Sequence, residues 1–150
     1  MATRKYDRPR VLAHRRPSGH IEREVTYVIA GIDTHKDTLA VAVVDDNGRL
    51  VAGGDVPNTE RGFAQLVDMF TAHHVQRVGI EGSGSFGRAV AVHLALCWQS
   101  DQPVAVVEVP TLMTSRERHG HLGKGKTDPV DALAIARITA REQQLPTVRL

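Results

Sequence analysis

Four acidic residues have the types and positions needed to form one site for divalent cations. Asp33 ends a first β-rich run of the chain, and Glu81 ends a later one. In α/β sheets, ligands collect at the carboxyl ends of the strands. Asp128 and Asp131 begin a helical pattern three residues apart, and this spacing places two side chains on one face of a helix. We therefore expect the four carboxylates to converge.

Carboxylates that converge repel one another unless a cation binds among them. Their oxygen atoms are the ligands that hard ions such as Mg²⁺ and Mn²⁺ prefer. Two such ions about 3.5 to 4 Å apart can stabilise the attacking and leaving oxygens of a displacement at phosphorus. The pattern therefore indicates phosphoryl transfer, with these acids as metal-binding and catalytic residues: Asp33, Glu81, Asp128 and Asp131.

Each acid also has a structural interpretation. Asp128, Pro129 and Asp131 fit a helix start with an N-cap, a proline at the first helical position and an acid at the third. Asp33 and Glu81 could each cap a turn. The site interpretation is favoured because the structural one requires three separate coincidences, at the helix start, at Asp33 and at Glu81.

A basic stretch directly precedes Asp128. Within eleven residues it holds Arg116, Arg118, His119, His121, Lys124 and Lys126. Such a cluster beside a phosphate site is suited to contact the backbone of a nucleic acid. Lys36, with His35 just after Asp33, is a further candidate for orienting the substrate. The alternative is that the stretch is a solvated loop and that Lys36 is an exposed turn residue.

The periodicity of the chain predicts the elements that would position these residues. Strands are expected over 25–33, 38–46, 48–56, 77–81 and 103–109, and helices over 59–72, 86–98 and 128–143. Residues 111–126 are polar and glycine-punctuated, which predicts a loop or a frayed helix. Three consecutive strands followed by alternating helices and strands predict an α/β fold with a mixed five-stranded sheet and flanking helices.

The composition and the charge distribution indicate how the chain is divided into domains. The 150 residues are 41% hydrophobic with a net charge of +2, enough for one compact domain. Residues 1–24 carry seven Arg or Lys and three acidic residues with little apolar pattern, so we expect a disordered basic arm before a domain over 25–150. The arm is either a phosphate-contacting tail or a solvated leader.

No apolar run is long enough to span a membrane, and no apolar core follows the basic residues as in a secretory signal. Cys97 is the sole cysteine, which excludes an internal disulfide and a thiolate metal site. These features predict a cytoplasmic protein without a membrane partner.

Three segments resemble the DEDD-type insertion-sequence transposases, whose N-terminal domain is similar to the Holliday-junction resolvase RuvC. They are residues 31–48, 78–87 and 115–137, and the likeness covers about residues 25–145. The most specific is the run from the basic loop into K-T-D-x-x-D-A, formed by Lys126, Thr127, Asp128, Asp131 and Ala132. Ser83 and Phe86 depart slightly from the threonine and tyrosine of many members.

The resemblance implies a ribonuclease H-like (RuvC-like) fold, a divalent-metal quartet of the four acids, DNA binding and DNA transposition. Some members use a structured bridge RNA as a guide, and recombination of two duplexes favours a homo-oligomer. Members continue into a second domain with a nucleophilic serine, which no serine here matches. A truncated transposase is therefore expected, whose own enzymatic activity the sequence leaves open.

Three alternatives remain. Gly82, Gly84 and Gly87 spell G-x-G-x-x-G, and Glu108 follows at a distance suited to a ribose, which is typical of an NAD-binding turn. An actin-like ATP-binding domain also opens with G-I-D, although Thr34 to Lys36 do not match its phosphate loop. The third alternative is a catalytically inactive remnant that keeps only the fold.

Overall fold

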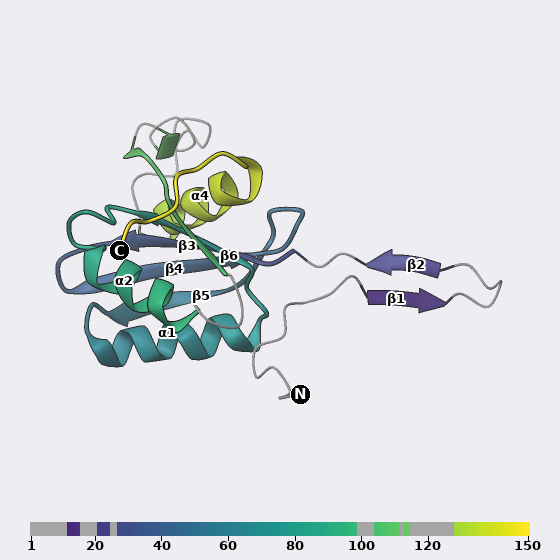
Figure 1. Cartoon of the computed structure of the whole chain (residues 1–150), viewed down its shortest axis with the longest axis horizontal. Coiled ribbons are helices and arrows are strands. Elements are labelled where there is room, and N and C mark those ends of the chain that lie inside the picture. Colours follow the sequence, from purple (N-terminus) through teal and green to yellow (C-terminus); the bar gives the residue numbers. More distant parts are fainter. Residues whose placement is uncertain (1–11, 16–20, 25–26, 99–103, 112, 115–127) are drawn as a thin grey trace.

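The computed structural model describes residues 12–15, 21–24, 27–98, 104–111, 113–114 and 128–150, with the backbone alone in 12–15, 21–24 and 128–130. The main sheet consists of β3 (Ile29–Thr34), β4 (Thr38–Val44), β5 (Leu50–Pro57), β6 (Arg77–Glu81) and β7 (Ala105–Glu108). It is covered by α1 (Glu60–Ala72), α2 (Arg88–Cys97) and α4 (Asp128–Arg141). Helix α4 lies on one face of the sheet, and α1 and α2 lie on the other (Figure 1).

The sheet has the strand order β5-β4-β3-β6-β7. Strands β3, β4 and β5 form consecutive antiparallel hairpins, whereas β6 is parallel to β3 and β7 is parallel to β6. Parallel neighbours need crossover connections, which α1 and α2 supply. The expected mixed five-stranded α/β sheet with flanking helices is confirmed.

Alternation along the strands divides their side chains between two cores. One face of β3 and β6 joins α1 and α2 in the larger core, which includes Ala30, Ile32, Val78, Ile80, Phe63, Leu66, Phe70, Val90 and Leu94. The other face packs against α4 through small side chains, among them Ala40, Ala42, Ala132 and Ala136. Thr59 caps α1 by accepting a hydrogen bond from Gly62 N at 3.3 Å.

Two glycines let α4 approach the sheet closely. A Cβ atom on Gly31 would lie 2.3 Å from Ala136 N and 2.6 Å from Ala132 O. On Gly79, the neighbour of Gly31 across the β3–β6 pair, it would lie 1.7 Å from Thr139 Oγ1. The backbone of α4 therefore lies directly on β3, and its Thr139 side chain lies on β6, so a larger residue at either glycine would clash.

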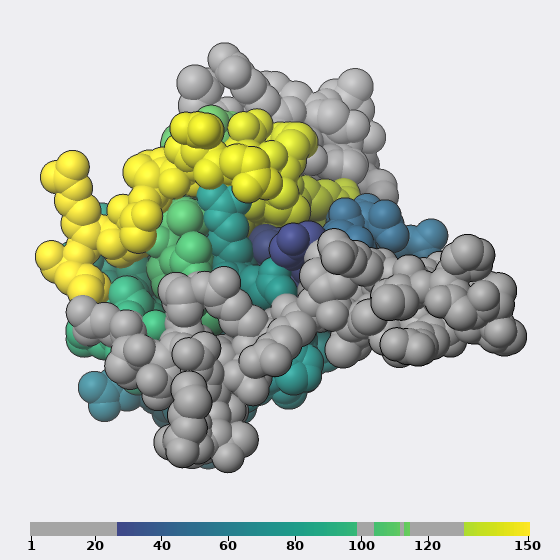
Figure 2. Space-filling view, turned by 45° about the vertical axis from the view of Figure 1, so that its right-hand side comes forward, coloured from purple at the N-terminus to yellow at the C-terminus, as the bar shows by residue number. Residues whose placement is uncertain are grey.

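The C-terminal end of α4 is fixed at the amino end of β6. The Arg77 guanidinium donates to Thr139 O at 2.5 Å and to Glu142 O at 2.6 Å, carbonyls that the helix end leaves without helical partners. Beyond the helix, Val148 N donates to Val106 O at 2.9 Å, so the last residues run along β7 (Figure 2). The N-terminal turn of α4 consequently lies toward the carboxyl ends of β3 and β6.

Part of the basic N-terminal segment forms two short strands. Strand β1 (Leu12–Arg15) pairs antiparallel with β2 (Ile21–Glu24) in a separate two-stranded sheet, which lies apart from the main one (Figure 1). The sequence between them holds Pro17 and Gly19, residue types that favour turns. The remainder of residues 1–24 lies outside the described part of the chain. None of the helices described is long and apolar enough to cross a membrane.

Candidate functional site: an acidic cluster at the carboxyl ends of β3 and β6

Asp33 and Glu81 face each other across the central parallel pair of strands. They are Cα partners in the β3–β6 register, and neighbouring strands are separated by about 4.8 Å. Each acid lies two residues after the glycine that contacts α4, so alternation places both acids on the α4 face of the sheet. The Thr34 hydroxyl ties the two strand ends together by donating to Glu81 O at 2.8 Å.

Helix α4 brings a third carboxylate to this edge. Asp131 immediately precedes Ala132, whose carbonyl lies against Gly31, and its negative charge acts on Asp33. Asp128 is the first residue of α4, one turn before Ala132, and its side chain lies outside the described atoms. The structure thus places Asp33, Glu81 and Asp131 at one edge of the sheet. The helix that begins with Asp128, the fourth expected acid, starts at the same edge.

The carboxyl group of Asp33 is buried, with 7% of the residue exposed. The pKa of this group is raised from the ordinary 3.8 to about 6, chiefly by burial. The negative charges of Asp131 and Glu81 also raise this pKa, whereas His35 lowers it. His35 Nε2 lies 3.0 Å from Asp33 Oδ2. Because a carboxylate oxygen can only accept, the ring nitrogen is the donor in this bond.

The chemistry of these donors fits a divalent cation. A desolvated carboxylate beside two like charges is stabilised by a cation that neutralises them, and carboxylate oxygens suit Mg²⁺ and Mn²⁺. Among the residues described, no three His, Cys, Asp or Glu side chains are close enough to hold an ion as they stand. Asp33, Glu81 and Asp131 remain the expected ligands of such an ion, with Asp128 as the expected fourth.

The glycine-rich turn between β6 and α2 is closed on itself. Gly82, with φ of 81°, accepts hydrogen bonds at its carbonyl from Ser85 N at 3.0 Å and Gly87 N at 2.8 Å. Ser83 N donates to Glu108 Oε2 at 3.1 Å. Dinucleotide-binding turns offer backbone N–H groups to phosphate, but three of those N–H groups here already have partners within the protein. The geometry therefore argues against the NAD-binding alternative.

The remaining expected site residues divide into two groups. Lys36 is exposed in the loop between β3 and β4, directly after His35. The basic residues of the stretch before α4 lie outside the described part of the chain; they are Arg116, Arg118, Lys124 and Lys126. Two residues outside the expected site contact the loops beside the acids: Asn58, and Glu108, which only the NAD-binding alternative had considered. The repeated pattern Gly-x-acid at residues 31–33 and 79–81 is the signal that could have linked the two strands.

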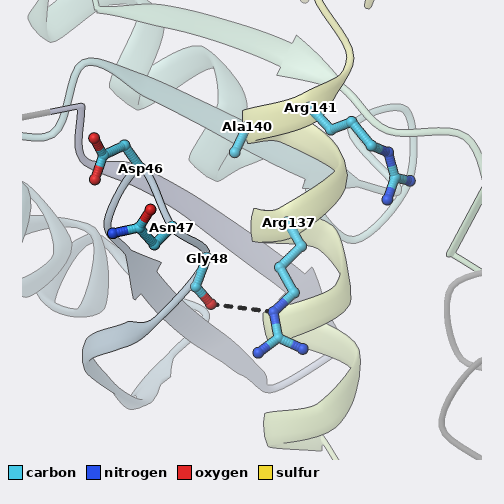
Figure 3. Close-up of a pocket in the computed structure, with 6 residues that line it drawn as sticks. All are labelled: Asp46, Asn47, Gly48, Arg137, Ala140 and Arg141. Atoms are coloured by element: carbon cyan, nitrogen blue, oxygen red, sulfur yellow. Dashed lines mark hydrogen bonds between the residues drawn. The ribbon is translucent and has the colours of Figure 1, made fainter.

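A pocket lies at the opposite end of the sheet. Its volume is about 340 Å³, and it is lined by the β4–β5 turn and the second half of α4 through Asp46, Asn47, Gly48, Arg137, Ala140 and Arg141. Arg137 Nε donates to Gly48 O at 3.2 Å, whereas the Arg141 side chain extends away from the turn (Figure 3). None of the expected site residues lines this pocket, so we interpret the contact as one that fixes α4 to the hairpin.

The architecture of the chain matches that of a solved structure. The structure of RuvC from Thermus thermophilus superimposes with a TM-score of 0.59 over 81% of this chain and 99% of that chain, at 18% sequence identity. Likeness at this low identity establishes the fold alone. The chain has the RuvC-like, ribonuclease H-like architecture that its sequence motifs imply.

The family follows from the sequence over most of the chain. The model of the IS110-type DEDD transposases, described as "Transposase", matches residues 30–150. The chain belongs to this family. A Streptomyces coelicolor protein that carries the name of a mini-circle transposase for IS117 is 29% identical over 114 residues, which cover 74% of this chain. The chain spans about a quarter, 26%, of the length of that curated relative.

Proposed function

We propose that this domain binds Mg²⁺ or Mn²⁺ through Asp33, Glu81, Asp128 and Asp131 and supports phosphoryl transfer at DNA phosphodiesters during transposition. The observation that carries the proposal is the β3–β6 register, in which Asp33 and Glu81 are Cα partners, together with the negative charge of Asp131 that acts on Asp33. Family membership supports the same reaction class. When bound, divalent cations would neutralise charge on the reacting phosphate oxygens.

The protein's own groups would position the reaction. The rigid strands β3 and β6 hold two carboxylates side by side, and α4 brings the third over the same edge. His35 orients the Asp33 carboxyl group through its hydrogen bond at 3.0 Å. The exposed ammonium of Lys36 is available to contact a phosphate near this edge.

We further propose that the basic residues 116–126 hold the nucleic-acid backbone next to the acids. Their sequence position directly before α4 supports this, because α4 begins at the acidic edge. DNA is the expected partner. We propose a structured guide RNA as a further partner, because RNA and DNA present the same phosphate groups. A homo-oligomer and the participation of a second, serine-bearing domain are further parts of it.

Titration with Mn²⁺ tests the metal site. The parent chain is compared with Asp33→Asn combined with Glu81→Gln, and with Asp68→Asn, which removes an exposed carboxylate on α1 at the other face of the sheet. Calorimetry should show binding in the parent and in Asp68→Asn and no binding in the double variant. If all three chains bind Mn²⁺ equally, the acids of β3 and β6 do not form the site.

Fluorescence anisotropy with labelled branched DNA, and with a structured RNA, tests the nucleic-acid part. The combined change Lys124→Ala and Lys126→Ala should weaken binding to either and reduce its salt dependence, because fewer counterions are released. Arg61→Ala, which removes an exposed cation on α1, is the matched control. Metal binding without any nucleic-acid binding at low salt would leave the inactive-remnant alternative as the better account.

A further inference from the structure

Asn58 joins the two loops that border the acidic edge. Its side-chain Nδ2 group donates to His35 O at 2.9 Å, in the loop after β3, and to Phe86 O at 2.9 Å, in the turn after β6. Its backbone N–H donates to Asp37 O, also at 2.9 Å. Both amide hydrogens and the backbone donor of one residue are therefore used to hold two loops that are distant in sequence.

These loops are continuous with the strands that carry the acids. His35 is two residues beyond Asp33 and donates to its carboxylate, so the position of the His35 backbone determines that contact. Phe86 closes the turn that follows Glu81, and that turn is otherwise held by Gly82 O and by Glu108. A displacement of either loop would change the orientation of a carboxylate at the shared edge.

We infer that Asn58 is a positioning residue, which keeps the Asp33 and Glu81 loops in the relative placement that metal binding requires. This inference rests on the proposed metal-binding function and extends it to a residue outside the acidic quartet. Groups that orient metal ligands through hydrogen bonds commonly change metal affinity by about 10-fold to 100-fold when they are removed. A residue that only stabilised the fold would not change metal affinity selectively.

The neighbouring residue provides a matched control. Thr59 accepts a hydrogen bond from Gly62 N and caps α1, so Thr59→Ala also removes a polar interaction at the same place in the sequence. It leaves the bonds of Asn58 to both loops intact. A comparison of Asn58→Ala with Thr59→Ala therefore separates positioning of the loops from a general loss of stability.

The experiment measures Mn²⁺ binding to the full chain from the electron paramagnetic resonance signal of free Mn²⁺. Asn58→Ala should bind Mn²⁺ about tenfold more weakly than the parent, and Thr59→Ala should match the parent. Asn58→Asp keeps the shape of the side chain, loses both donors and adds a negative charge. A purely electrostatic effect would strengthen its binding, whereas the loss of loop positioning should weaken it.

Hydrogen exchange without metal gives a second readout. The amides of His35, Ser85 and Gly87 hydrogen-bond within the two loops and should exchange roughly tenfold faster in Asn58→Ala, with no change in Thr59→Ala. Equal Mn²⁺ affinity and equal exchange in the two variants would overturn the inference and leave the proposed function standing. Absence of Mn²⁺ binding in the parent would instead overturn the proposed function, and the metal role of Asn58 with it.

Discussion

Asp33 and Glu81 are directly paired across the parallel strands β3 and β6, although β4, β5 and α1 separate them in the sequence. Their adjacency results from the crossover that places β6 beside β3 rather than beside β5. Gly31 and Gly79, two residues earlier on each strand, are also paired, and α4 packs against both of them. The same short stretch of sheet therefore positions both the carboxylates and the helix that brings Asp131 to them.

The raised pKa of Asp33 makes stability depend on pH. Because the pKa rises from 3.8 to about 6 on folding, the contribution of this group to stability is full below pH 3.8 and is lost as pH rises through 6. Asp33→Asn removes the cost of burying a charge and should gain about 3 kcal/mol relative to the parent between pH 4 and 7. Urea unfolding across this range measures the difference, with Asp55→Asn, an exposed carboxylate on β5, as the control. A constant difference for Asp33→Asn would contradict the prediction.

The pKa of Asp33 should also report its neighbours. The charge of Asp131 raises this pKa more than the charge of Glu81 does. Asp131→Asn should therefore lower the Asp33 pKa by more than Glu81→Gln does, as read from the carbon chemical shift of its carboxyl group during a nuclear magnetic resonance titration. The reverse order would mean that α4 approaches the acidic edge less closely than the structure has it.

The close approach of α4 predicts a large penalty at Gly31. In Gly31→Ala the added Cβ would meet helix backbone atoms at 2.3 and 2.6 Å, which cannot rotate away. The free energy of unfolding should fall by about 3 kcal/mol or more. Gly84→Ala is the control, because no atom lies within 4 Å of the Cβ position there. Thermal or urea unfolding of both variants tests this, and equal stability would show that α4 can move off the sheet.

The contact of Arg77 with the end of α4 predicts a smaller effect. Arg77→Ala removes donors to the carbonyls of Thr139 and Glu142 and should destabilise the chain by about 2 kcal/mol. Arg61→Ala, an exposed arginine on α1, should change stability by less than about 0.5 kcal/mol. Chemical unfolding compares the two. An equal effect would mean that water replaces the contacts of Arg77 without cost.

The pattern of the chain was sufficient to predict the type and order of the elements in the main sheet. Hydrophobic periodicity and turn residues identified the strands that carry Asp33 and Glu81 and the helix that begins at Asp128. These are local properties, since alternation and helical spacing act over a few residues. The motif that runs into Asp128 and Asp131 also indicated the transposase family, which the family comparison confirmed. The metal-binding role of the acids stays a prediction.

The tertiary structure decided which residues meet. Asp33 is paired with Glu81 because of the strand order, which no local pattern specifies. The raised pKa of Asp33 depends on burial and on charges from β6 and α4. The hydrogen bonds of Asn58 join the loop of the β3–β4 hairpin to the turn that follows β6. The G-x-G-x-x-G turn has a dinucleotide-binding sequence, yet its N–H groups are satisfied within the protein. The sequence by itself determined which elements form and which chemical groups they carry, because both are local, whereas long-range packing determined the site.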